Sequence, residues 1–486
     1  MLESTFISQI LPVEALVPEV YKQWRPLVRD AIALVFSHLS QARLAPKLAE
    51  QLVLPPDTPP EVRLLRLIEK MPGLQKLGQV LARNQHLDPS LREQLSKLEN
   101  GITGADLNEI RSTIVSELRQ KLEDHAVELD TVIFCEASVS AVVRFTWMND
   151  GTGQRERGVF KVLKPYVPEC LAEDMALLRQ VAEYVASHDA EYGFAARPVP
   201  DTVAEVCRLL EREIDFPREQ ANLKEASRVY DAVPGVVIPR VIEPLCTDGI
   251  TAMTEEPGLK ITDAFAGKPW LRSQVAEQLV EALIAVPLFS EEELAIFHAD
   301  PHAGNLLYDE RTGKLVILDW ALTEQLSREQ RRKTLILTVL LALRDVAGVA
   351  SMIKDLGRSD SVHIIDEGVA RFIDALPASR LPGSLEVMQL FDQLALAGVR
   401  FPAALLMFRK ARFTLDGVLH DIAGPKARVD ENVLSYFVKR WMTTAGTSYS
   451  PLSVSDWIPV QISALLYPAR FWTDTLRQLY GAGVTR

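Results

Sequence analysis

The pattern of apolar and polar residues divides the chain into a helical first part, a strand-rich middle and a helical last part. From Leu27 to Leu44 the apolar residues recur at every third or fourth position, as one face of a helix requires. Prolines interrupt this pattern at Pro46 and again between residues 55 and 60. A second helical region follows from Glu61 to about Lys121, so residues 1–125 are predicted to form a helical domain.

Short runs rich in β-branched and aromatic residues replace the helical period after residue 125. They predict strands of an antiparallel sheet at residues 131–134, 141–147 and 158–163, with a turn at Asn149-Asp150-Gly151. Two helices are predicted at 173–186 and 203–230, and two further short strands at 236–239 and 250–253. Together these elements form a predicted nucleotide-binding lobe, residues 126–256.

Helices dominate from Leu271 onward, apart from a predicted hairpin whose strands, 305–308 and 315–318, flank Arg311-Thr312-Gly313. We predict a helical catalytic lobe over 257–430 and a helical tail over 431–486. A sheet-rich lobe followed by a helical lobe is an α+β arrangement, and a cleft between the two is the expected ligand site.

The segment from Phe297 to Asn305 carries the most informative chemistry. Asp300 and Asn305 have the Asp-x-x-x-x-Asn spacing of a kinase catalytic loop, and Asp319, fourteen residues after the Asn, follows an apolar strand. Phosphoryl transfer needs a carboxylate near the incoming hydroxyl or water, while an amide oxygen and a second carboxylate hold Mg²⁺ against the nucleotide phosphates. The predicted hairpin brings Asn305 and Asp319 to one end of two paired strands.

Taken one at a time, these residues also have structural interpretations. His298 and His302 are typical of buried or loop-bracing histidines, and Asp300 is typical of a turn cap. Two histidines four residues apart suggest a metal site, but neither a helix nor a His-Glu-x-x-His pattern supports zinc here. The ordered set, with its strand in the right place, favours the kinase interpretation.

A kinase also requires an upstream lysine on a strand and a glutamate to pair with it. Lys161 lies on a strand between apolar neighbours and so calls for a partner. The candidates lie in residues 213–219, a charge-rich stretch that by itself is typical of a solvated helix face. The Gly-x-Gly-x-x-Gly loop of ordinary kinases is replaced by Cys-Glu-Ala-Ser-Val-Ser-Ala at 135–141, which opens fewer backbone conformations. An ordinary protein kinase is therefore not favoured.

These residues resemble the UbiB/AarF-like atypical kinases, the ubiquinone-biosynthesis family that includes mitochondrial coenzyme Q kinases. The resemblance runs from about Leu74 to Gly424, and Leu405 to Leu419 resembles the family's late helix. Three marks are specific to it: Lys76-Leu77-Gly78-Gln79 is similar to the Lys-x-Gly-Gln motif, Ala137-Ser138 to the Ala-rich loop, and Glu213-Ile214-Asp215 to the Glu-x-Asp motif.

The resemblance implies a two-lobed protein-kinase-like fold with an added N-terminal helical domain, and it implies ATP and Mg²⁺ as cofactors. By that analogy Lys161 binds the phosphates and pairs with Glu219, and Asp300 is the catalytic aspartate. Asn305 and Asp319 are the implied Mg²⁺ ligands. In the added-domain motif of Lys76, Gly78 and Gln79, the lysine reaches Glu213 and Asp215. The implied nucleotide-binding set is Ala137, Ser138, Lys161, Met253 and Glu255.

The family further implies an ATPase or small-molecule kinase that supports quinone and prenyl-lipid metabolism. The phosphate acceptor would be a small molecule, a lipid or water rather than a protein, and an isoprenoid or quinone precursor is the implied lipid partner. An aminoglycoside- or choline-kinase-like phosphotransferase is an alternative, because those enzymes resemble the chain at His298-x-Asp300 and Ile317-Leu318-Asp319-Trp320. They lack the Lys76 motif.

Three positions depart from the family pattern. Glu136 replaces a small residue beside the Ala-rich loop, where an inward carboxylate would repel phosphates. That change supports a third interpretation, a pseudokinase scaffold that binds nucleotide without turnover. Ala303 stands where the family has Pro, which loosens the loop. Trp320-Ala321 replaces Phe-Gly after the metal-binding Asp and argues against a regulatory flip of that segment.

Composition and charge narrow the setting. The 486 residues are 48% hydrophobic and 24% charged, as in ordinary globular proteins, and the net charge of −12 argues against nucleic-acid binding. The four cysteines, Cys135, Cys170, Cys207 and Cys246, stand 35 to 39 residues apart and are expected to be reduced structural thiols. No signal peptide is recognisable, and the longest apolar stretch, 334–343, is too short to span a bilayer. We expect a cytoplasmic location.

The charge is unevenly distributed. From Ala403 to Arg486 ten Lys and Arg face six Asp and Glu, a net charge of +4 that leaves −16 for the preceding 402 residues. The same region holds Trp441, Trp457 and Trp472. Aromatic rings beside basic groups suit peripheral contact of residues 431–486 with an anionic membrane, and they suit a helix docked on the kinase lobe equally well. The sequence leaves the oligomeric state open.

Overall fold

The computed structural model describes residues 11–82, 105–192, 198–265, 269–359, 362–377, 382–424, 429 and 431–433. The chain divides into two compact units. The first unit comprises Met1–Ala221 and Arg240–Glu255, and the second comprises Asn222–Pro239 and Glu256–Arg486. Most of the predicted tail, from residue 434 onward, lies outside the described residues.

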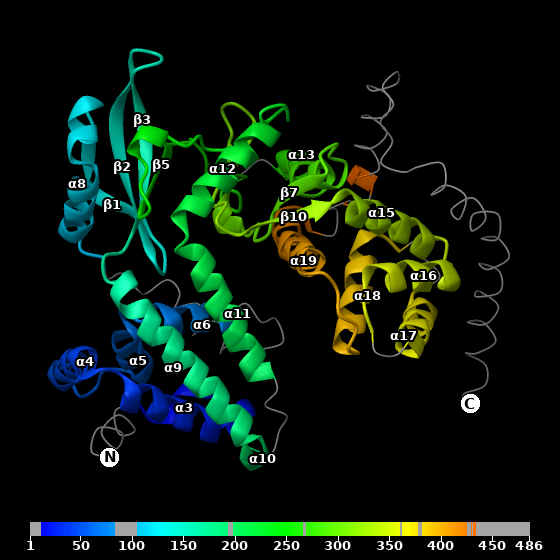
Figure 1. Ribbon diagram of the computed structural model, residues 1–486, viewed down its shortest axis with the longest axis horizontal. Coiled ribbons are helices and arrows are strands. Elements are labelled where there is room, and N and C mark those ends of the chain that lie inside the picture. The colour runs from blue at the N-terminus through cyan, green and yellow to red at the C-terminus, as the bar shows by residue number, and fades with distance from the viewer. Residues whose placement is uncertain are drawn as a thin grey trace. The chain divides into compact units, whose positions relative to one another are not determined.

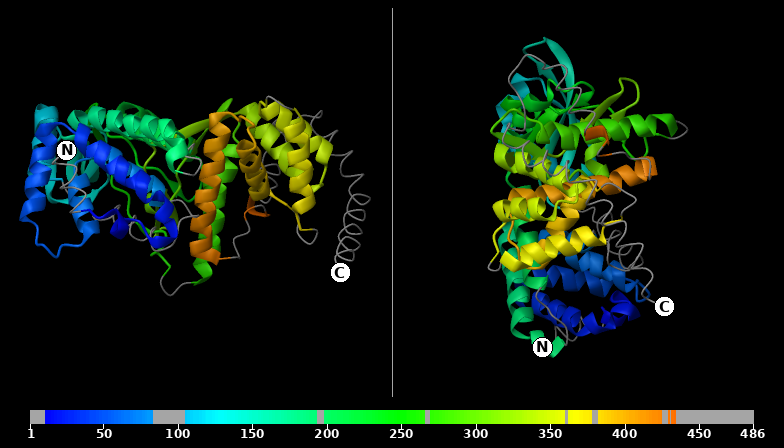
Figure 2. Two further views of the ribbon diagram at one scale, coloured as in Figure 1. Left: turned by 90° about the horizontal axis from the view of Figure 1, so that it is seen from below. Right: turned by 90° about the vertical axis from the view of Figure 1, so that its right-hand side faces the viewer.

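The first unit begins with a set of helices around an apolar core. They are α2 (Val13–Leu16), the 3-10 helix η1 (Glu19–Trp24), α3 (Arg25–His38), α4 (Gln41–Val53), α5 (Pro60–Ile68) and α6 (Pro72–Ala82). Phe36, Leu67 and Met71 are buried in this core together with Leu177 and Val181 of α9 (Val167–Ser187), so α9 belongs to the same packing unit. The helices α3 and α9 pack against each other, and Figure 2 shows them side by side.

The predicted break at Pro46 is wrong. Pro46 lies inside α4, and the helical run predicted from Leu27 to Leu44 instead breaks between α3 and α4, at Leu39 and Ser40. A proline inside a helix forfeits one backbone hydrogen bond, so α4 is held by its contacts rather than by intrinsic propensity. One such contact is the hydrogen bond from the Ser40 amide to Glu173 of α9, 2.6 Å long.

A four-stranded antiparallel sheet forms the centre of the first unit, in the order β1 (Glu128–Glu136), β2 (Ser140–Asn149), β3 (Gln154–Leu163), β5 (Ile250–Thr254). Its first three strands contain the predicted runs. Phe145 and Phe160 stack in the core at 4.0 Å between ring centroids. Gly158 is required beside them, because a Cβ there would lie 2.5 Å from the Phe145 ring. The helix α8 (Leu107–Asp124) packs against β1 (Figure 1), and it is capped by the preceding Asp106, whose side chain accepts from the Asn108 amide.

The remaining helices lie between β3 and β5 along the chain, and the last long one crosses into the second unit after Ala221. The predicted helix at 203–230 is two helices, α11 (Pro198–Glu213) and α12 (Phe216–Tyr230), which are interrupted at Ile214 and Asp215. The short α10 (Asp189–Tyr192) and the 3-10 helix η2 (Glu243–Leu245) complete the unit. Because α6 packs against both α9 and α11, the first unit joins the N-terminal helices to the elements around the sheet.

The second unit contains two small sheets. One has the order β4 (Val236–Val237), β9 (Lys314–Ile317), β8 (Leu306–Asp309), β6 (Leu259–Lys260), and the other pairs β7 (Leu294–His298) with β10 (Thr323–Ser327). The predicted hairpin is confirmed as β8 and β9, with Leu306 opposite Ile317. The sequence pattern does not predict β7 and β10, so the expectation of helices alone around this hairpin is wrong.

Helices build the rest of the second unit, in agreement with the predicted helical lobe. They are α13 (Pro269–Val280), a π-helical turn η3 (Glu281–Ala285), α14 (Val286–Leu288), α15 (Arg328–Ala342), α16 (Val346–Leu356), α17 (Val362–Ala375), α18 (Ser384–Leu396) and α19 (Ala403–Ala423). From α15 to α19 each helix packs against the next. In addition, α15 packs against α18 (Figure 1). Within the described ranges, no helix is both long and apolar enough to cross a membrane.

Candidate active site

Lys161 lies on β3 of the first unit, and its ammonium group is paired with a buried glutamate. Its Nζ lies 2.6 Å from Oε1 of Glu219, which stands in the first turn of α12 and is 2% exposed. The Lys161 ammonium also lies 5.8 Å from the ring centre of Phe216. A buried carboxylate requires such a partner, and the ion pair fixes the position of the Lys161 ammonium group.

The loop between β1 and β2 carries Ala137 and Ser138, and it is held at several points. The Ala137 amide donates to the Ser140 carbonyl over 2.8 Å, and its own carbonyl accepts from Nζ of Lys164 over 2.7 Å. Lys164, directly after β3, is completely buried, and this burial lowers its pKa. The loop is therefore shaped by hydrogen bonds in place of glycines.

Glu136 at the start of this loop is turned toward the protein. Its Oε1 accepts from the Ala105 amide over 2.7 Å and lies 3.9 Å from Nζ of Lys164. The carboxylate that the sequence places near the phosphates is thus engaged by a backbone N–H and a buried ammonium.

The added-domain motif reaches the same loop. Lys76 of α6 is buried and pairs with Glu213, the last residue of α11, and the other oxygen of Glu213 accepts from the Ser138 hydroxyl over 3.3 Å. Asp215 has a different contact from the one implied: its carboxylate accepts from the Arg218 amide over 3.1 Å and caps α12. Gly78 and Gln79 follow on α6.

Two further residues of the implied nucleotide-binding set end the sheet. Met253 on β5 lies opposite Val159 of β3. Glu255, just past β5, accepts from Nε of Arg144 over 2.7 Å. The Glu255 carboxylate is thus bound to Arg144 of β2, while the Glu255 backbone continues the direction of β5.

In the second unit, Asp300 and Asn305 lie on the loop between β7 and β8. The Asn305 side-chain nitrogen donates to the Asp300 carbonyl over 3.3 Å, which leaves the amide oxygen as its ligand atom. His298 braces this loop, with Nε2 3.0 Å from the Leu318 carbonyl and Nδ1 accepting from the Asp300 amide. His302 caps the 3-10 turn η4 (Ala303–Asn305), since its Nδ1 accepts from the Gly304 amide over 3.0 Å. The loop-bracing interpretation of both histidines is confirmed.

Asp319 stands at the same end of the hairpin as Asn305. The Leu318 amide donates to the Asn305 carbonyl over 2.8 Å, which holds the ends of the two strands together. Asp319 has a left-handed backbone, with φ of 55°. Such conformations cost free energy and recur at functional sites.

The residue after Asp319 anchors the segment in the core. Trp320 is fully buried, donates from Nε1 to the Ile317 carbonyl over 3.2 Å and packs against Tyr230 and His298. Its carbonyl accepts from the Asn222 side chain over 3.1 Å and from the Thr323 hydroxyl over 2.7 Å. These contacts agree with the expectation that Trp320-Ala321 limits movement of the segment.

The donor atoms of Asn305 and Asp319 fit Mg²⁺, which prefers amide and carboxylate oxygens. No set of three or more His, Cys, Asp and Glu side chains is arranged for a metal ion in the described part of the chain. A two-ligand site of this kind therefore depends on further oxygens from phosphate and water, as is usual for Mg²⁺.

A family profile described as the ABC1 atypical kinase-like domain matches residues 97–353, more than half of the chain. The chain belongs to the ABC1 atypical kinase-like family. Lys161, Glu219, Asp300, Asn305 and Asp319 lie inside the matched range, whereas the Lys76 motif precedes it.

Several individual proteins are similar to the chain. The ABC1 chain is 24% identical over 367 residues to a probable protein kinase UbiB of Xylella fastidiosa, covering 73% of this chain and 65% of that protein. It is 25% identical over 370 residues to an uncharacterized Synechocystis protein, covering 72% and 60%. The chain thus spans less than two thirds of these relatives. A Mycobacterium tuberculosis protein solved with erythromycin aligns at 17% identity and a TM-score of 0.44, covering 79% of this chain and 94% of that one.

Sequence reasoning missed three contributors: Lys164, the inward engagement of Glu136, and a buried ion cluster around Asp174. Asp174 had a detectable signal, because it stands between Leu171 and Leu178 on the apolar stripe of α9, where a carboxylate requires a partner. Lys164 had none, since a lysine after a strand is ordinarily exposed.

Proposed function

We propose that the chain is an atypical kinase-like enzyme that binds Mg-ATP and transfers its γ-phosphate to a small molecule, a lipid or water. We further propose that it serves quinone or prenyl-lipid metabolism, with an isoprenoid or quinone precursor as the lipid partner. Membership in the ABC1 family and the relative named as a probable protein kinase support the coarser part of this proposal.

The observation that carries the proposal is the β8–β9 hairpin. It brings the residues Asn305 and Asp319 to one end of two paired strands, and they follow Asp300 by five and nineteen residues. Only the ordered combination of these three residue types has a use in phosphoryl transfer, because each one alone also has a structural role.

Each residue has a role in this mechanism. Asp300 would accept the proton of the attacking hydroxyl or water, and Glu219 would hold the Lys161 ammonium toward the phosphates. Asn305 and Asp319 would hold Mg²⁺, which when bound neutralises charge on the phosphates. The buried Trp320 keeps the Asp319 backbone in its left-handed conformation.

The pairing of Lys76 with Glu213 supports this function over the aminoglycoside- or choline-kinase-like alternative. Those enzymes lack the Lys76 motif, and here the motif contacts Glu213, which also binds Ser138 of the β1–β2 loop. The inward position of Glu136 weakens the main argument for a pseudokinase, because its carboxylate is engaged by Ala105 and Lys164.

The test is Mg²⁺-dependent ATP turnover by wild type and Asp319→Asn, in the presence and absence of detergent and isoprenoid lipid. We expect turnover to fall by about 100-fold or more, because the substitution removes the charge of a proposed metal ligand. Asp309→Asn is the matched control. It removes the same charge from the opposite end of the hairpin, where Asp309 caps the turn through the Arg311 amide and the Thr312 hydroxyl.

Asp309→Asn should keep turnover near the wild-type value, although it weakens the hydrogen bonds that hold the turn of the hairpin. Equal rates for wild type and Asp319→Asn would contradict the assignment of this site. Thermal stabilisation of the wild type by Mg-ATP, with no turnover under any of these conditions, would favour the pseudokinase interpretation.

A further inference from the structure

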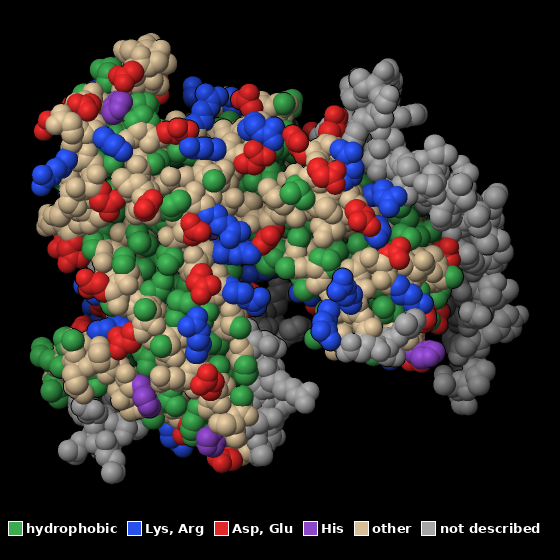
Figure 3. All heavy atoms as spheres, viewed as in Figure 1, with side chains coloured by type: hydrophobic (Ala, Val, Ile, Leu, Met, Phe, Trp, Pro, Cys, Tyr) green, Lys and Arg blue, Asp and Glu red, His purple; other side chains and the backbone are tan. Residues whose placement is uncertain are grey.

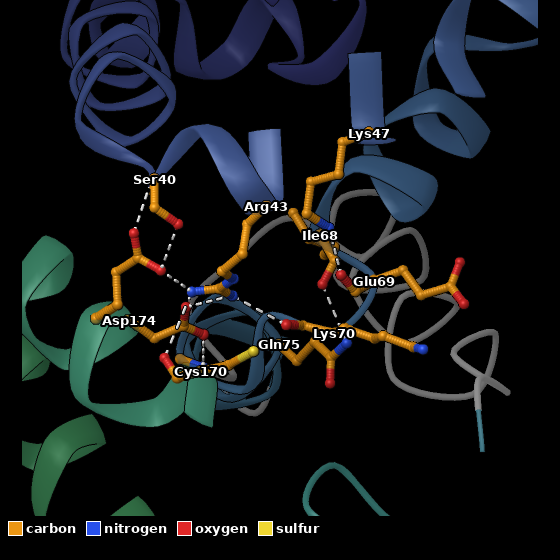
Figure 4. Close-up of polar contacts among 11 residues, drawn as sticks. Ser40, Arg43, Lys47, Ile68, Glu69, Lys70, Gln75, Cys170 and Asp174 are labelled. Carbon is orange, nitrogen blue, oxygen red and sulfur yellow. Dashed lines mark hydrogen bonds and ion pairs between the residues drawn. The ribbon is translucent and has the colours of Figure 1, made fainter. Parts of the chain in front are cut away.

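An ion cluster around the buried Asp174 joins α4 to α9 (Figure 4). We call it the Arg43 cluster, and it consists of Ser40, Arg43, Glu173 and Asp174. The Arg43 guanidinium lies 2.8 Å from Oδ1 of Asp174 and 2.7 Å from Oε2 of Glu173. Glu173 also accepts from the Ser40 amide over 2.6 Å. Asp174 is 2% exposed, and burial raises its pKa against the opposing effect of the Arg43 charge.

Asp174 has a second contact, to the first turn of α6. Its Oδ2 accepts from the Gly73 amide over 3.0 Å. Pro72 begins this helix without an N–H, and the preceding Met71 has no polar side-chain atom to cap it, so the cap comes from α9. The approach is close: a Cβ at Gly73 would lie 3.0 Å from Cβ of Asp174 and 3.1 Å from Leu178.

Arg43 fixes the chain just before α6 as well. Its Nη2 donates over 3.0 Å to the carbonyl of Lys70, whose φ of 56° is left-handed. A residue with a side chain adopts this conformation only at a cost in free energy, so it persists where neighbouring contacts enforce it. Arg43 and Asp174 together thus determine where α6 starts.

The helix fixed in this way carries Lys76, one turn after Gly73. Lys76 pairs with Glu213 of α11, and Glu213 accepts from the Ser138 hydroxyl on the β1–β2 loop. Every residue in this series belongs to the first unit. A continuous set of contacts therefore runs from Asp174 through α6 to the loop that the proposed function assigns to nucleotide binding.

We propose that Asp174 is a positioning residue for nucleotide binding: by capping α6 at Gly73 it places Lys76 so that Glu213 holds Ser138 and the β1–β2 loop. This inference rests on the proposed function for its catalytic consequence. Its structural part, the coupling of Asp174 to the loop, does not depend on ATP and is tested separately.

The test uses Asp174→Asn in the full chain. An amide presents one acceptor oxygen and a donor NH₂, so it cannot serve both Arg43 and Gly73. Two quantities are measured: amide hydrogen exchange of residues 136–140 without nucleotide, and the dissociation constant of Mg-ATP. We expect faster exchange in the loop and a dissociation constant raised about fivefold, the lower end of typical coupling between sites.

Glu173→Gln is the matched control, because Glu173 contacts the same arginine but has no hydrogen bond or ion pair with α6 among the described residues. It should lower stability without changing loop exchange or the Mg-ATP dissociation constant. A purely structural role for Asp174 predicts the same result for both variants. In a Lys76→Met background, Asp174→Asn should have no further effect on Mg-ATP binding while still lowering stability, since the route through Lys76 is already cut.

Gly73→Ala tests the same contact from the side of α6 if Asp174→Asn does not fold. Loop exchange equal to wild type in the folded variant, or a full effect of Asp174→Asn in the Lys76→Met background, would overturn the inference. Absence of Mg-ATP binding by wild type would overturn the proposed function instead, and the exchange result would still decide the coupling.

Discussion

At the scale of single residues, Lys47 beside the Arg43 cluster is the clearest case of an ammonium group whose charged form is disfavoured by burial. Its ammonium donates to the Glu69 carbonyl. Burial, assisted by the charge of Arg43, lowers the pKa of Lys47 from 10.5 to about 8, while the acidic groups of Glu69, Asp174 and Glu50 act in the opposite direction. The folded state therefore releases this proton well before the unfolded chain does.

The stability of the chain should accordingly rise with pH between about 8 and 10 through Lys47. In that window the unfolded state binds more protons at this position than the folded state, so raising the pH favours folding by up to about 1.4 kcal/mol per pH unit. Lys47→Met removes this group. Between pH 8 and 10 the free energy of unfolding of wild type should therefore increase by about 2 kcal/mol relative to that of Lys47→Met.

Urea denaturation of both proteins at pH 7, 8, 9 and 10 measures this difference. Lys22→Met, at an exposed lysine on η1, is the control and should run parallel to wild type. A constant difference between wild type and Lys47→Met from pH 8 to 10 would show that the Lys47 pKa is not depressed.

At the scale of elements, the β1–β2 loop is held from outside its own strands. Glu136 ties it to Ala105, just before α8, and Lys164 ties it to the end of β3. The second carboxylate oxygen of Glu136 is buried with no hydrogen-bond partner among the described residues. The loop is consequently stiffened by charged groups that are shielded from water. Hydrogen bonds and ion pairs are stronger in this low-dielectric environment than in water.

Glu136→Ala should therefore destabilise the chain and weaken nucleotide binding. The substitution leaves the Ala105 amide without its acceptor and the buried Lys164 ammonium without its counter-charge, at a cost of about 1–3 kcal/mol in the free energy of unfolding. Urea denaturation and the Mg-ATP dissociation constant measure the two effects.

Glu136→Gln keeps an acceptor for the Ala105 amide. Its free energy of unfolding and its Mg-ATP dissociation constant should therefore lie between those of Glu136→Ala and wild type. Tighter Mg-ATP binding by Glu136→Ala would contradict the engaged position of the carboxylate and restore the idea that Glu136 repels phosphates.

Elements set by local pattern could be predicted from the sequence, and elements set by distant partners could not. The strands β1 to β3 and the β8–β9 hairpin follow from alternation and from a turn within a few residues, so Asn305 and Asp319 could be placed in advance. The pairing of β7 with β10 joins segments more than twenty residues apart and leaves no local signal. Pro46 stays helical because α4 is fixed by α9, which no property of α4 itself indicates.

The site residues divide in the same way. The need of an ammonium on an apolar strand for a carboxylate limits the partner of Lys161 to residues 213–219, and only the family resemblance singles out Glu219 among them. Asp215 was matched to Lys76 by analogy alone, and its side chain caps α12 instead. Helix capping competes for every Asp that precedes a helix, which makes such residues poor candidates for long-range contacts.

At the scale of the whole molecule, charges of both signs are mixed on the face drawn in Figure 3. Figure 3 shows basic and acidic side chains interspersed on the face in view, with no large area of one sign. The net charge of −12 therefore does not produce a visible acidic face there. Residues 431–486 differ in composition, since they hold five Lys and Arg against three Asp and Glu, together with three of the seven tryptophans.

This composition predicts weak, salt-sensitive binding of the full chain to anionic membranes, lost on deletion of residues 431–486. Each basic residue near an anionic surface contributes about 1 kcal/mol, and tryptophan rings favour the interface, so a few such groups give only reversible attachment. Co-sedimentation with vesicles of phosphatidylserine and phosphatidylcholine, against phosphatidylcholine alone, measures it. Binding should fall at about 0.5 M salt, because the Debye length becomes shorter than the distance to the surface. Co-sedimentation that survives the deletion would contradict the assignment of membrane binding to residues 431–486.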